Sequence, residues 1–203
     1  MTLNPPSGMK HRHETEIKLV VKDPKAVRGR LAELGFRPVL ARHFESNYLF
    51  DFPDHRLRKA RCLLRLRFAR DRGLVTFKGA PLRSADYKIR PEIETSVADG
   101  HCLREILHNL GMREVFCYEK FRTIFAPRGK REVSDAPHAV FDETPIGNFL
   151  ELEGPQRWID EVARQLGYSR EEYITESYAA LHRKKCLEEG KRPGNMVFRM
   201  RKS

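Results

Sequence analysis

Long apolar runs are missing from this sequence, and no stretch approaches the roughly 20 apolar residues that a membrane-spanning helix needs. Cysteine is also scarce. The four cysteines, Cys62, Cys102, Cys117 and Cys186, lack the paired spacing of a zinc site and fit a reduced compartment best. The first residues are polar, without the apolar core of a secretion signal. These absences argue against a membrane protein and a cysteine-bound metal, and they predict a cytoplasmic location.

Acidic residues are outnumbered, with 28 Asp and Glu against 39 Lys and Arg, which gives a net charge of +11. Such a charge favours polyanionic partners, although a basic coat could equally reflect solvation or weak attraction to nucleic acid. Much of the excess is expected outside the binding face, in the stretch from Lys191 to Lys202 and at Arg56, Arg58, Lys59, Arg61, Arg70 and Arg72. The 203 residues suffice for one domain, which we expect over residues 12–189, between a flexible lead at 1–11 and a flexible basic tail at 190–203.

One short segment near the amino terminus combines both charge signs. From His13 to Val21, the side chains of Glu14, Glu16 and Lys18 share one face of a predicted strand, because side chains alternate along a strand with a period of two. Two carboxylates and an ammonium on one wall suit a divalent cation together with a phosphate. The alternative is a solvated strand face.

The same alternation returns in later segments, where apolar or β-branched residues fill the alternate positions. It predicts strands at residues 13–21, 44–52, 62–69, 73–79, 87–97, 115–126, 138–142 and 148–153. A sheet face that merely meets water usually mixes polar residue types. The alternating polar positions here are almost all charged: Arg65, Arg67, Thr76, Lys78, Arg90, Glu92, Glu94, Lys120, Arg122, Asp142, Glu151 and Glu153.

About eight strands are enough to close a barrel. A barrel lined by both charge signs would be a wet tunnel, with its apolar faces pointing outward and covered by helices. Residues 24–34, 99–110, 155–166 and 176–189 have apolar positions at helical spacing. We therefore predict an α+β fold, an eight-stranded antiparallel barrel with a charged lumen and helices outside.

This ordered set of charged motifs resembles the CYTH family, the triphosphate tunnel metalloenzymes. The resemblance spans roughly residues 12–187, and the order of the motifs is more specific than any one of them. The family includes class IV adenylyl cyclases, thiamine triphosphatases and inorganic triphosphatases. The resemblance therefore implies an eight-stranded tunnel that acts on tripolyphosphate, ATP or thiamine triphosphate. The motifs that carry it are Glu14-x-Glu16-x-Lys18, Leu64-Arg65-Leu66-Arg67, the Lys78 strand, Arg90-x-Glu92-x-Glu94, Lys120-x-Arg122, Asp142 and Glu151-x-Glu153.

The charged residues divide into two groups by the chemistry expected of them. The cations are predicted to grip phosphate oxygens: Lys18, Arg65, Arg67, Lys78, Arg90, Lys120 and Arg122. The carboxylates are predicted to hold one or two Mg²⁺ or Mn²⁺ ions: Glu14, Glu16, Glu92, Glu94, Asp142, Glu151 and Glu153. Positioning and electrostatic stabilisation supply most of the catalysis in phosphoryl transfer, and Lys78, Glu14 and Glu16 are the predicted catalytic residues.

Two reactions remain open on such a site. In a triphosphatase, water attacks the terminal phosphorus, and a metal or Lys78 helps to deprotonate that water. In an adenylyl cyclase, the ribose 3′-hydroxyl of ATP attacks the α-phosphorus, and pyrophosphate leaves. We favour hydrolysis and keep cyclisation as the alternative.

A few other residues are expected to lie outside the site. Aromatic rings that could stack a base, those of Phe44, Tyr48 and Phe50, are expected in the outer core because of their parity. Tyr178 is expected to pack rather than to reach the tunnel. His11 and His13 are expected to be exposed to solvent rather than to bind a metal.

A third interpretation is a basic protein that binds polyphosphate or RNA without any chemistry. Such a binder depends steeply on salt and needs no carboxylates on its binding face. The predicted face carries many carboxylates, so a nucleic-acid partner is not expected. A homodimer is one expectation for the assembly, which the sequence does not define.

Overall fold

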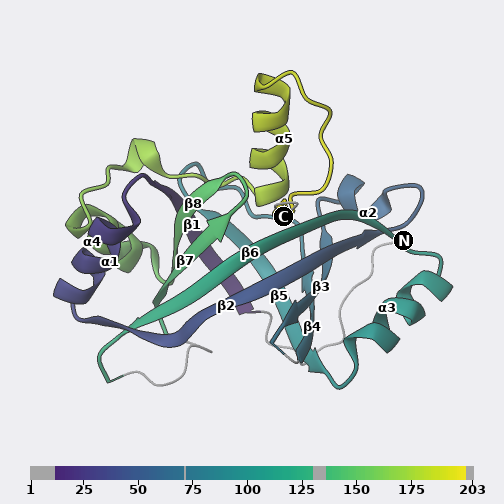
Figure 1. Cartoon of the computed structure of the whole chain (residues 1–203), viewed down its shortest axis with the longest axis horizontal. Coiled ribbons are helices and arrows are strands. Elements are labelled where there is room, and N and C mark those ends of the chain that lie inside the picture. Colours follow the sequence, from purple (N-terminus) through teal and green to yellow (C-terminus); the bar gives the residue numbers. More distant parts are fainter. Residues whose placement is uncertain (1–11, 71, 130–135, 200–203) are drawn as a thin grey trace.

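Eight antiparallel strands close into a barrel in the computed structural model, which describes residues 12–70, 72–129 and 136–199 (Figure 1). Around the barrel the order is β1-β5-β4-β3-β2-β6-β7-β8, and β8 pairs with β1 to complete the ring. The strands are β1 (Arg12–Val21), β2 (Phe36–Asp51), β3 (Leu63–Ala69), β4 (Arg72–Lys78), β5 (Lys88–Val97), β6 (Arg113–Pro127), β7 (His138–Thr144) and β8 (Gly147–Glu153). The predicted fold class is confirmed.

The predicted helices are present, and one short helix was not predicted. They are α1 (Pro24–Glu33), α2 (Arg56–Lys59), α3 (Gly100–Asn109), α4 (Gln156–Gln165) and α5 (Tyr178–Glu188), with a single 3₁₀ turn, η1, at Arg170–Glu172. Asp23 caps α1 and Asp99 caps α3, each accepting two backbone N–H groups of the first helical turn. The α2 turn was missed because four residues give no helical periodicity.

Strand β2 is longer than the sequence predicts, since it begins at Phe36 rather than at residue 44. Its first half pairs with the end of β6, and the register slips at two places between Pro38 and His43. Such irregularities let a strand tolerate Pro38, whose missing N–H reads as a strand breaker in sequence. The extra length makes β2 and β6 the two longest strands, and they cross the front of the molecule in Figure 1.

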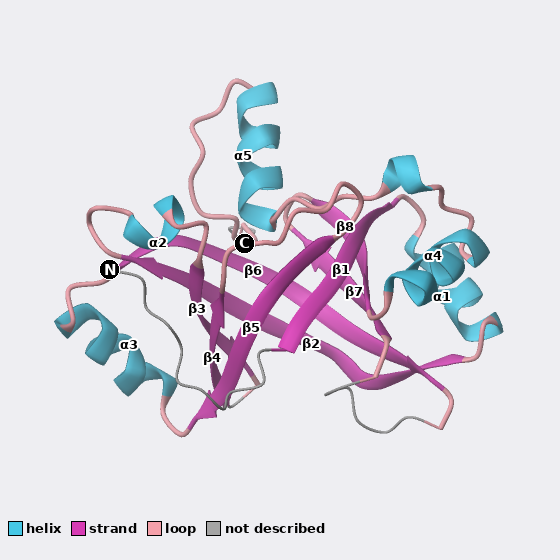
Figure 2. Ribbon diagram, turned by 180° about the vertical axis from the view of Figure 1, so that it is seen from behind, coloured by secondary structure: helices cyan, strands magenta, loops and turns pink. Residues whose placement is uncertain are grey.

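The apolar core lies outside the barrel, between its strands and the helices. Helices α1 and α4 sit together over one end of the barrel, while α3 covers the other end (Figure 2). Leu31 of α1 and Ile159 of α4 are fully buried against the outward-facing side of β1, β7 and β8. Leu107 of α3 packs with Phe50 and Leu66. The inverted arrangement predicted from the strand pattern, with apolar faces outward and charges inward, is confirmed.

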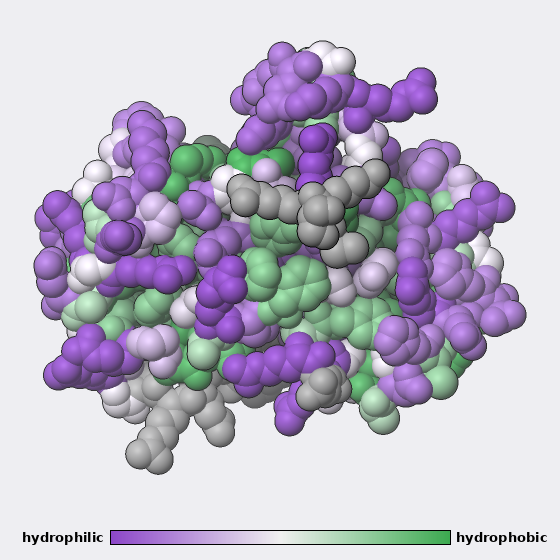
Figure 3. Space-filling model, in the orientation of Figure 1, coloured by the Kyte–Doolittle hydropathy of each residue, from purple (hydrophilic) through white to green (hydrophobic). Residues whose placement is uncertain are grey.

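Part of the front face is not covered by a helix. Figure 3 shows an apolar area near the centre of this face, within a largely hydrophilic surface. Phe44 of β2, expected in the outer core, is instead 43% exposed, and its ring meets Phe121 of β6 edge to face. Tyr48 and Phe50 pack in the cluster under α3, as expected for outer-core residues.

The carboxy-terminal segment differs from its prediction as a flexible tail. Residues 195–198 lie along β6, where Met196 is completely buried and exchanges backbone hydrogen bonds with Cys117 and Glu119. Residues 1–11, including His11, and residues 200–203 lie outside the described part of the chain, while His13 is exposed. Among the described residues, no helix is long and apolar enough to cross a membrane.

Candidate functional site

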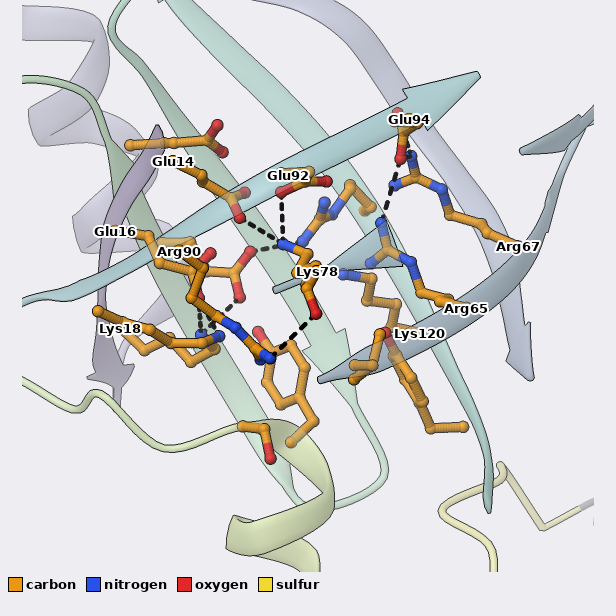
Figure 4. A pocket seen from close by; sticks show the side chains of 18 of the residues that line it. Glu14, Glu16, Lys18, Arg65, Arg67, Lys78, Arg90, Glu92, Glu94 and Lys120 are labelled. Atoms are coloured by element: carbon orange, nitrogen blue, oxygen red, sulfur yellow. Dashed lines mark hydrogen bonds and ion pairs between the residues drawn. The ribbon is translucent and has the colours of Figure 1, made fainter. Parts of the chain in front are cut away.

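A cavity of about 600 Å³ runs through the barrel, and charged side chains line it from all sides (Figure 4). Every residue predicted for the site lines this cavity except Asp142. The structure thereby brings together predicted residues from six strands, β1, β3, β4, β5, β6 and β8. The predicted residues that line it are Glu14, Glu16, Lys18, Arg65, Arg67, Lys78, Arg90, Glu92, Glu94, Lys120, Arg122, Glu151 and Glu153.

One wall is built around the two glutamates of β1. Glu14 pairs with the Lys78 ammonium of β4, which also lies 2.8 Å from Glu92 Oε2 of β5. Glu16 accepts hydrogen bonds from Lys18 Nζ at 2.8 Å and from Lys88 Nζ at 2.5 Å. Acids and bases therefore alternate across neighbouring strands, so that each buried charge has an opposite charge beside it.

The protonation states on this wall follow from burial and from these pairs. Burial disfavours the Lys78 ammonium, yet Glu14, Glu16 and Glu92 together raise the pKa of Lys78 above its ordinary value. Burial would likewise raise the pKa of Glu16, but Lys18 and Lys88 outweigh it and hold that pKa well below its usual range. Both groups therefore stay charged at neutral pH.

Two groups on the same wall titrate near neutrality. Burial and the neighbouring Glu14 carboxyl raise the pKa of Glu92 to about 7, whereas the pKa of Glu14 is lowered, so the two carboxyls share a proton. Burial lowers the pKa of Lys88 to about 8, with Glu16 opposing the shift. Lys88 was missed in sequence, although it has the same strand parity as Arg90.

The second wall carries the arginine pair of β3. Arg65 donates to Thr76 Oγ1 at 3.0 Å and to Glu94 Oε2 at 3.2 Å, and Arg67 donates to both oxygens of Glu94. Behind them, Glu45 of β2 is 2% exposed and lies 3.5 Å from Arg67 Nη1. Glu45 was not predicted, although it has the same strand parity as Asn47 and Asp51.

Asp142 lies behind the third wall rather than in the cavity lining. It is fully buried and accepts hydrogen bonds from Lys120 Nζ at 2.9 Å, from both Nε and Nη2 of Arg122, and from the Tyr178 hydroxyl at 2.8 Å. Burial would raise its pKa, but Arg122 and Lys120 lower it to about 2. With both oxygens occupied by donors, Asp142 is suited to orienting cations and is not suited to binding a metal.

Tyr178 reaches the lumen, which corrects the expectation that it only packs. Its hydroxyl donates to Asp142, and the ammonium groups of Lys18 and Lys120 lie 5.5 and 5.3 Å from its ring centroid. The ring also packs against Phe149. Tyr178 opens α5, and a single aromatic residue at a helix start carries no sequence signal for this position.

Arg90 lines the cavity, but its guanidinium donates hydrogen bonds to backbone carbonyls. Its Nε donates to the Gly79 carbonyl and its Nη2 donates to the Arg61 carbonyl, each at 2.7 Å. These bonds tie the end of β4 to the loop before β3 (Figure 4 shows the guanidinium reaching the backbone of Lys78). Arg90 was predicted to bind phosphate, and the structure gives it a role in holding the wall.

The donor set fits a divalent cation bound partly by substrate. Among the described residues, no three His, Cys, Asp or Glu side chains are grouped closely enough to hold a metal by themselves. However, Glu14 and Glu92 are two carboxyls brought together in a buried site, where the Lys78 ammonium is paired with both of them. Mg²⁺ is commonly bound by one or two carboxylates, with phosphate oxygens and water completing its shell.

Comparison with known proteins agrees with this architecture. Residues 12–178 match the family model of the CYTH domain. The chain is 30% identical over 178 residues to a Methanocaldococcus jannaschii protein named "Putative adenylate cyclase", an alignment that covers 83% of this chain and 97% of that protein.

Solved structures share the fold at lower identity. A Vibrio parahaemolyticus protein, also described as a putative adenylate cyclase, superposes with a TM-score of 0.70 at 21% identity, covering 88% of this chain and 99% of its own. A Hippeastrum protein described as a putative adenylyl cyclase with a dominant triphosphatase activity has a TM-score of 0.58 at 17% identity, covering 88% and 97% of the two chains. The family match, the closed barrel and its charged lumen lead to one conclusion: the chain belongs to the CYTH family.

Proposed function

We propose that this protein is a divalent-metal-dependent enzyme that hydrolyses the terminal phosphate of an inorganic or organic triphosphate inside the barrel. The observation that carries the proposal is the balance of formal charge in the lumen network, which among the described residues combines eight Lys and Arg side chains with eight Asp and Glu side chains. The cations are Lys18, Arg65, Arg67, Lys78, Lys88, Arg90, Lys120 and Arg122. The carboxylates are Glu14, Glu16, Glu45, Glu92, Glu94, Asp142, Glu151 and Glu153.

Such a balance suits a ligand that brings both charge signs with it. A simple anion would have to displace the carboxylates from their cations, at the cost of leaving buried charges unpaired. A triphosphate that arrives with a divalent cation supplies both partners. Its oxygens would replace the carboxylates on the lysines and arginines, and the released carboxylates would hold the cation.

The two groups of side chains have separate tasks. Arg65, Arg67 and Arg122 offer forked donors to phosphate oxygens, while Lys78 and Lys18 offer point charges. Glu14 and Glu92 would hold the cation, with Glu16 beside them. When bound, such a cation neutralises charge on the phosphates and lowers the pKa of a bound water.

The lysines also differ in how they can handle the proton of the attacking water. The pKa of Lys78 is raised, so it remains an ammonium and donates to a phosphate oxygen, contrary to the sequence expectation that it assists deprotonation. The pKa of Lys88 is about 8, so a fraction of its Nζ is neutral just above neutral pH and can accept a proton.

Cyclisation of ATP is the second candidate, and the name of the Methanocaldococcus relative favours it. It requires a place for the nucleoside beside the phosphates. The ring of Tyr178 is an unsuitable platform for a base, since two ammonium groups and Phe149 already lie against it. We therefore place hydrolysis first.

The test measures phosphate and pyrophosphate release from tripolyphosphate, ATP and thiamine triphosphate, with Mg²⁺, with Mn²⁺ and with EDTA. Metal-dependent orthophosphate release is expected, and Glu14→Gln should reduce it at least 100-fold, in the range typical for losing one electrostatic group of a site. Glu105→Gln, on the exposed face of α3, is the matched control. Pyrophosphate and cyclic AMP from ATP alone would favour the cyclase. Binding without turnover, undiminished in Glu14→Gln, would favour a polyphosphate-binding protein.

A further inference from the structure

The end of the described chain completes an open strand edge of the barrel. β7 pairs with β6 only from Phe121 to Phe125, which leaves the earlier residues of β6 without a partner on that side. Residues 195–198, here called the strap, fill this gap. Met196 N–H donates to the Cys117 carbonyl and the Glu119 N–H donates to the Met196 carbonyl, each at 2.9 Å. Unpaired strand edges are costly when buried, so the strap has a defined place.

Side chains of the strap alternate as they do in a strand. Met196 points inward and is completely buried, whereas the next residue, Val197, is 38% exposed. Phe198 turns back to the barrel and its ring lies 5.3 Å from that of Phe121. Asn195 Oδ1 also accepts the Cys117 N–H at 2.9 Å. This alternation makes the segment an anchored strand and not a passive tail.

The strap and α5 share one apolar cluster at the same mouth of the tunnel. Met196 packs in a cluster with Tyr118, Phe149 and Tyr178. Tyr118 is the residue that the strap pairs with; its side chain lines the cavity, and its ring lies 6.2 Å from that of Tyr178. The first turn of α5, from Ser177 to Ala179, lines the cavity as well. The strap therefore contacts Tyr118, the residue of the cavity wall against which Tyr178 of α5 packs.

Between these two anchors, α5 stands away from the barrel and the chain returns along it to the strap (Figure 1). At the near end, Lys18 and Ile174 exchange two backbone hydrogen bonds of 2.9 Å, and the Tyr178 hydroxyl bonds to Asp142. Farther along α5, Lys185 Nζ donates to the Ile146 carbonyl at 3.1 Å and the His182 ring lies 6.0 Å from that of Phe116, and beyond the helix the strap leads back to the barrel. With the strap in place α5 is held at both ends as well as by these two contacts, and loss of the strap leaves the helix with fewer contacts and makes its local opening easier.

We propose that the strap holds α5 over this mouth of the tunnel and thereby excludes bulky triphosphates. The second half of this inference rests on the proposed function. A nucleoside attached to the phosphates needs room at a mouth, and Tyr178 occupies this one. Inorganic tripolyphosphate has no such group. Release of the strap therefore widens the choice of substrate toward nucleoside triphosphates.

The test compares Met196→Ala with Val197→Ala in the full-length protein. Each change removes one aliphatic side chain from adjacent strap residues, but only the first removes a buried anchor. Asn195→Ala is a milder release, since it removes one side-chain hydrogen bond, and it remains informative if Met196→Ala does not fold. Hydrogen exchange of the Ala180–Arg183 amides reports on α5, and the ratio of kcat/KM for ATP to that for tripolyphosphate reports on selection.

Met196→Ala should raise amide exchange in the first turns of α5 and raise the ATP to tripolyphosphate ratio at least threefold, with Asn195→Ala in the same direction and Val197→Ala like the parent protein. Unchanged α5 exchange in both Met196→Ala and Asn195→Ala would overturn the strap. Faster exchange with an unchanged ratio would overturn its role in selection. If the parent protein hydrolyses no triphosphate, the proposed function fails, but the exchange measurement still decides whether the strap holds α5.

Discussion

The protonation states of individual lumen residues are set by competition between burial, which disfavours charge, and pairing with opposite charges, which favours it. Glu92 shows this most clearly, because Lys78 stabilises its charge while burial and Glu14 oppose it, and the outcome is a pKa of about 7. In the unfolded chain a glutamate has a pKa of about 4.3. Between about pH 4.3 and 7 the folded protein therefore holds a proton on Glu92 that the unfolded chain has already lost. The contribution of Glu92 therefore lowers the free energy of unfolding as the pH rises from about 4.3 to 7.

Metal binding should expel this proton. We expect Mg²⁺ or Mn²⁺ affinity to fall about tenfold per pH unit below pH 7, since one proton competes with the cation. Calorimetry in buffers of different ionisation enthalpy should show close to one proton released at pH 6. Glu92→Gln should release none. Equal proton release by the parent protein and by Glu92→Gln would assign the proton to another group.

Arg90 allows a different residue-scale prediction. Its guanidinium binds the carbonyls of Gly79 and Arg61 within the protein, so Arg90→Ala should leave two carbonyls without their donor. We expect the free energy of unfolding in urea to fall by about 1–3 kcal/mol. If Arg90 only bound phosphate, its removal would relieve repulsion among the lumen cations and would leave the free energy of unfolding unchanged or higher.

At the scale of elements, the barrel is inverted, so helices are attached to its outside at a few close contacts. The start of α3 is one of them. A Cβ on Gly100 would lie 2.6 Å from Phe68 Cε1 and 3.3 Å from the Gly73 Cα, closer than side chains normally approach. Glycine at this position lets α3 meet β3 and β4 directly.

Two glycine substitutions should therefore have opposite signs. Gly100→Ala should destabilise the protein by about 1–3 kcal/mol through overpacking. Gly29→Ala, in α1 with nothing within 4 Å of its added Cβ, should stabilise it by about 0.5–1 kcal/mol through helix propensity. Thermal unfolding of the two variants gives the comparison. Stabilisation in both would mean that α3 can shift without loss.

For the whole molecule, the described Lys, Arg, Asp and Glu residues of the lumen network cancel in formal charge, so the formal net charge of +11 lies outside them. The outer charge should attract anions at long range, and this attraction is screened at physiological salt beyond about 8 Å. Inside, neither a cation nor a polyanion alone is complementary to a neutral lumen. Binding of each is expected to favour binding of the other.

This predicts reciprocal coupling between metal and triphosphate. Saturating Mg²⁺ should strengthen tripolyphosphate binding by about 5- to 150-fold, and saturating tripolyphosphate should strengthen Mg²⁺ binding by the same factor, because linkage is symmetric. Titration calorimetry measures both affinities, each with and without the other ligand. Lys88→Arg, which lacks the proposed proton acceptor, is used so that turnover does not disturb the titration. Tripolyphosphate affinity that is the same in EDTA and in Mg²⁺ would contradict the model of a balanced lumen.

The sequence by itself determined the barrel and the lining of its lumen. Strand alternation is a local property with a period of two, so the pattern from Glu14 to Lys18 and its later repeats assigned thirteen lining positions without any knowledge of pairing. It also placed Phe50 on the outside of the barrel, since that residue has the opposite parity to its charged neighbours.

Only the tertiary structure decided which of these charges are free for a ligand, because pairing joins residues distant in the chain. Asp142 has its oxygens filled by Lys120, Arg122 and Tyr178, and Arg90 binds backbone carbonyls. The strap was likewise hidden, since a short strand that fills an edge is recognised by its partner and carries little pattern of its own. Local periodicity fixes the direction of a side chain, and the closed barrel fixes what it meets.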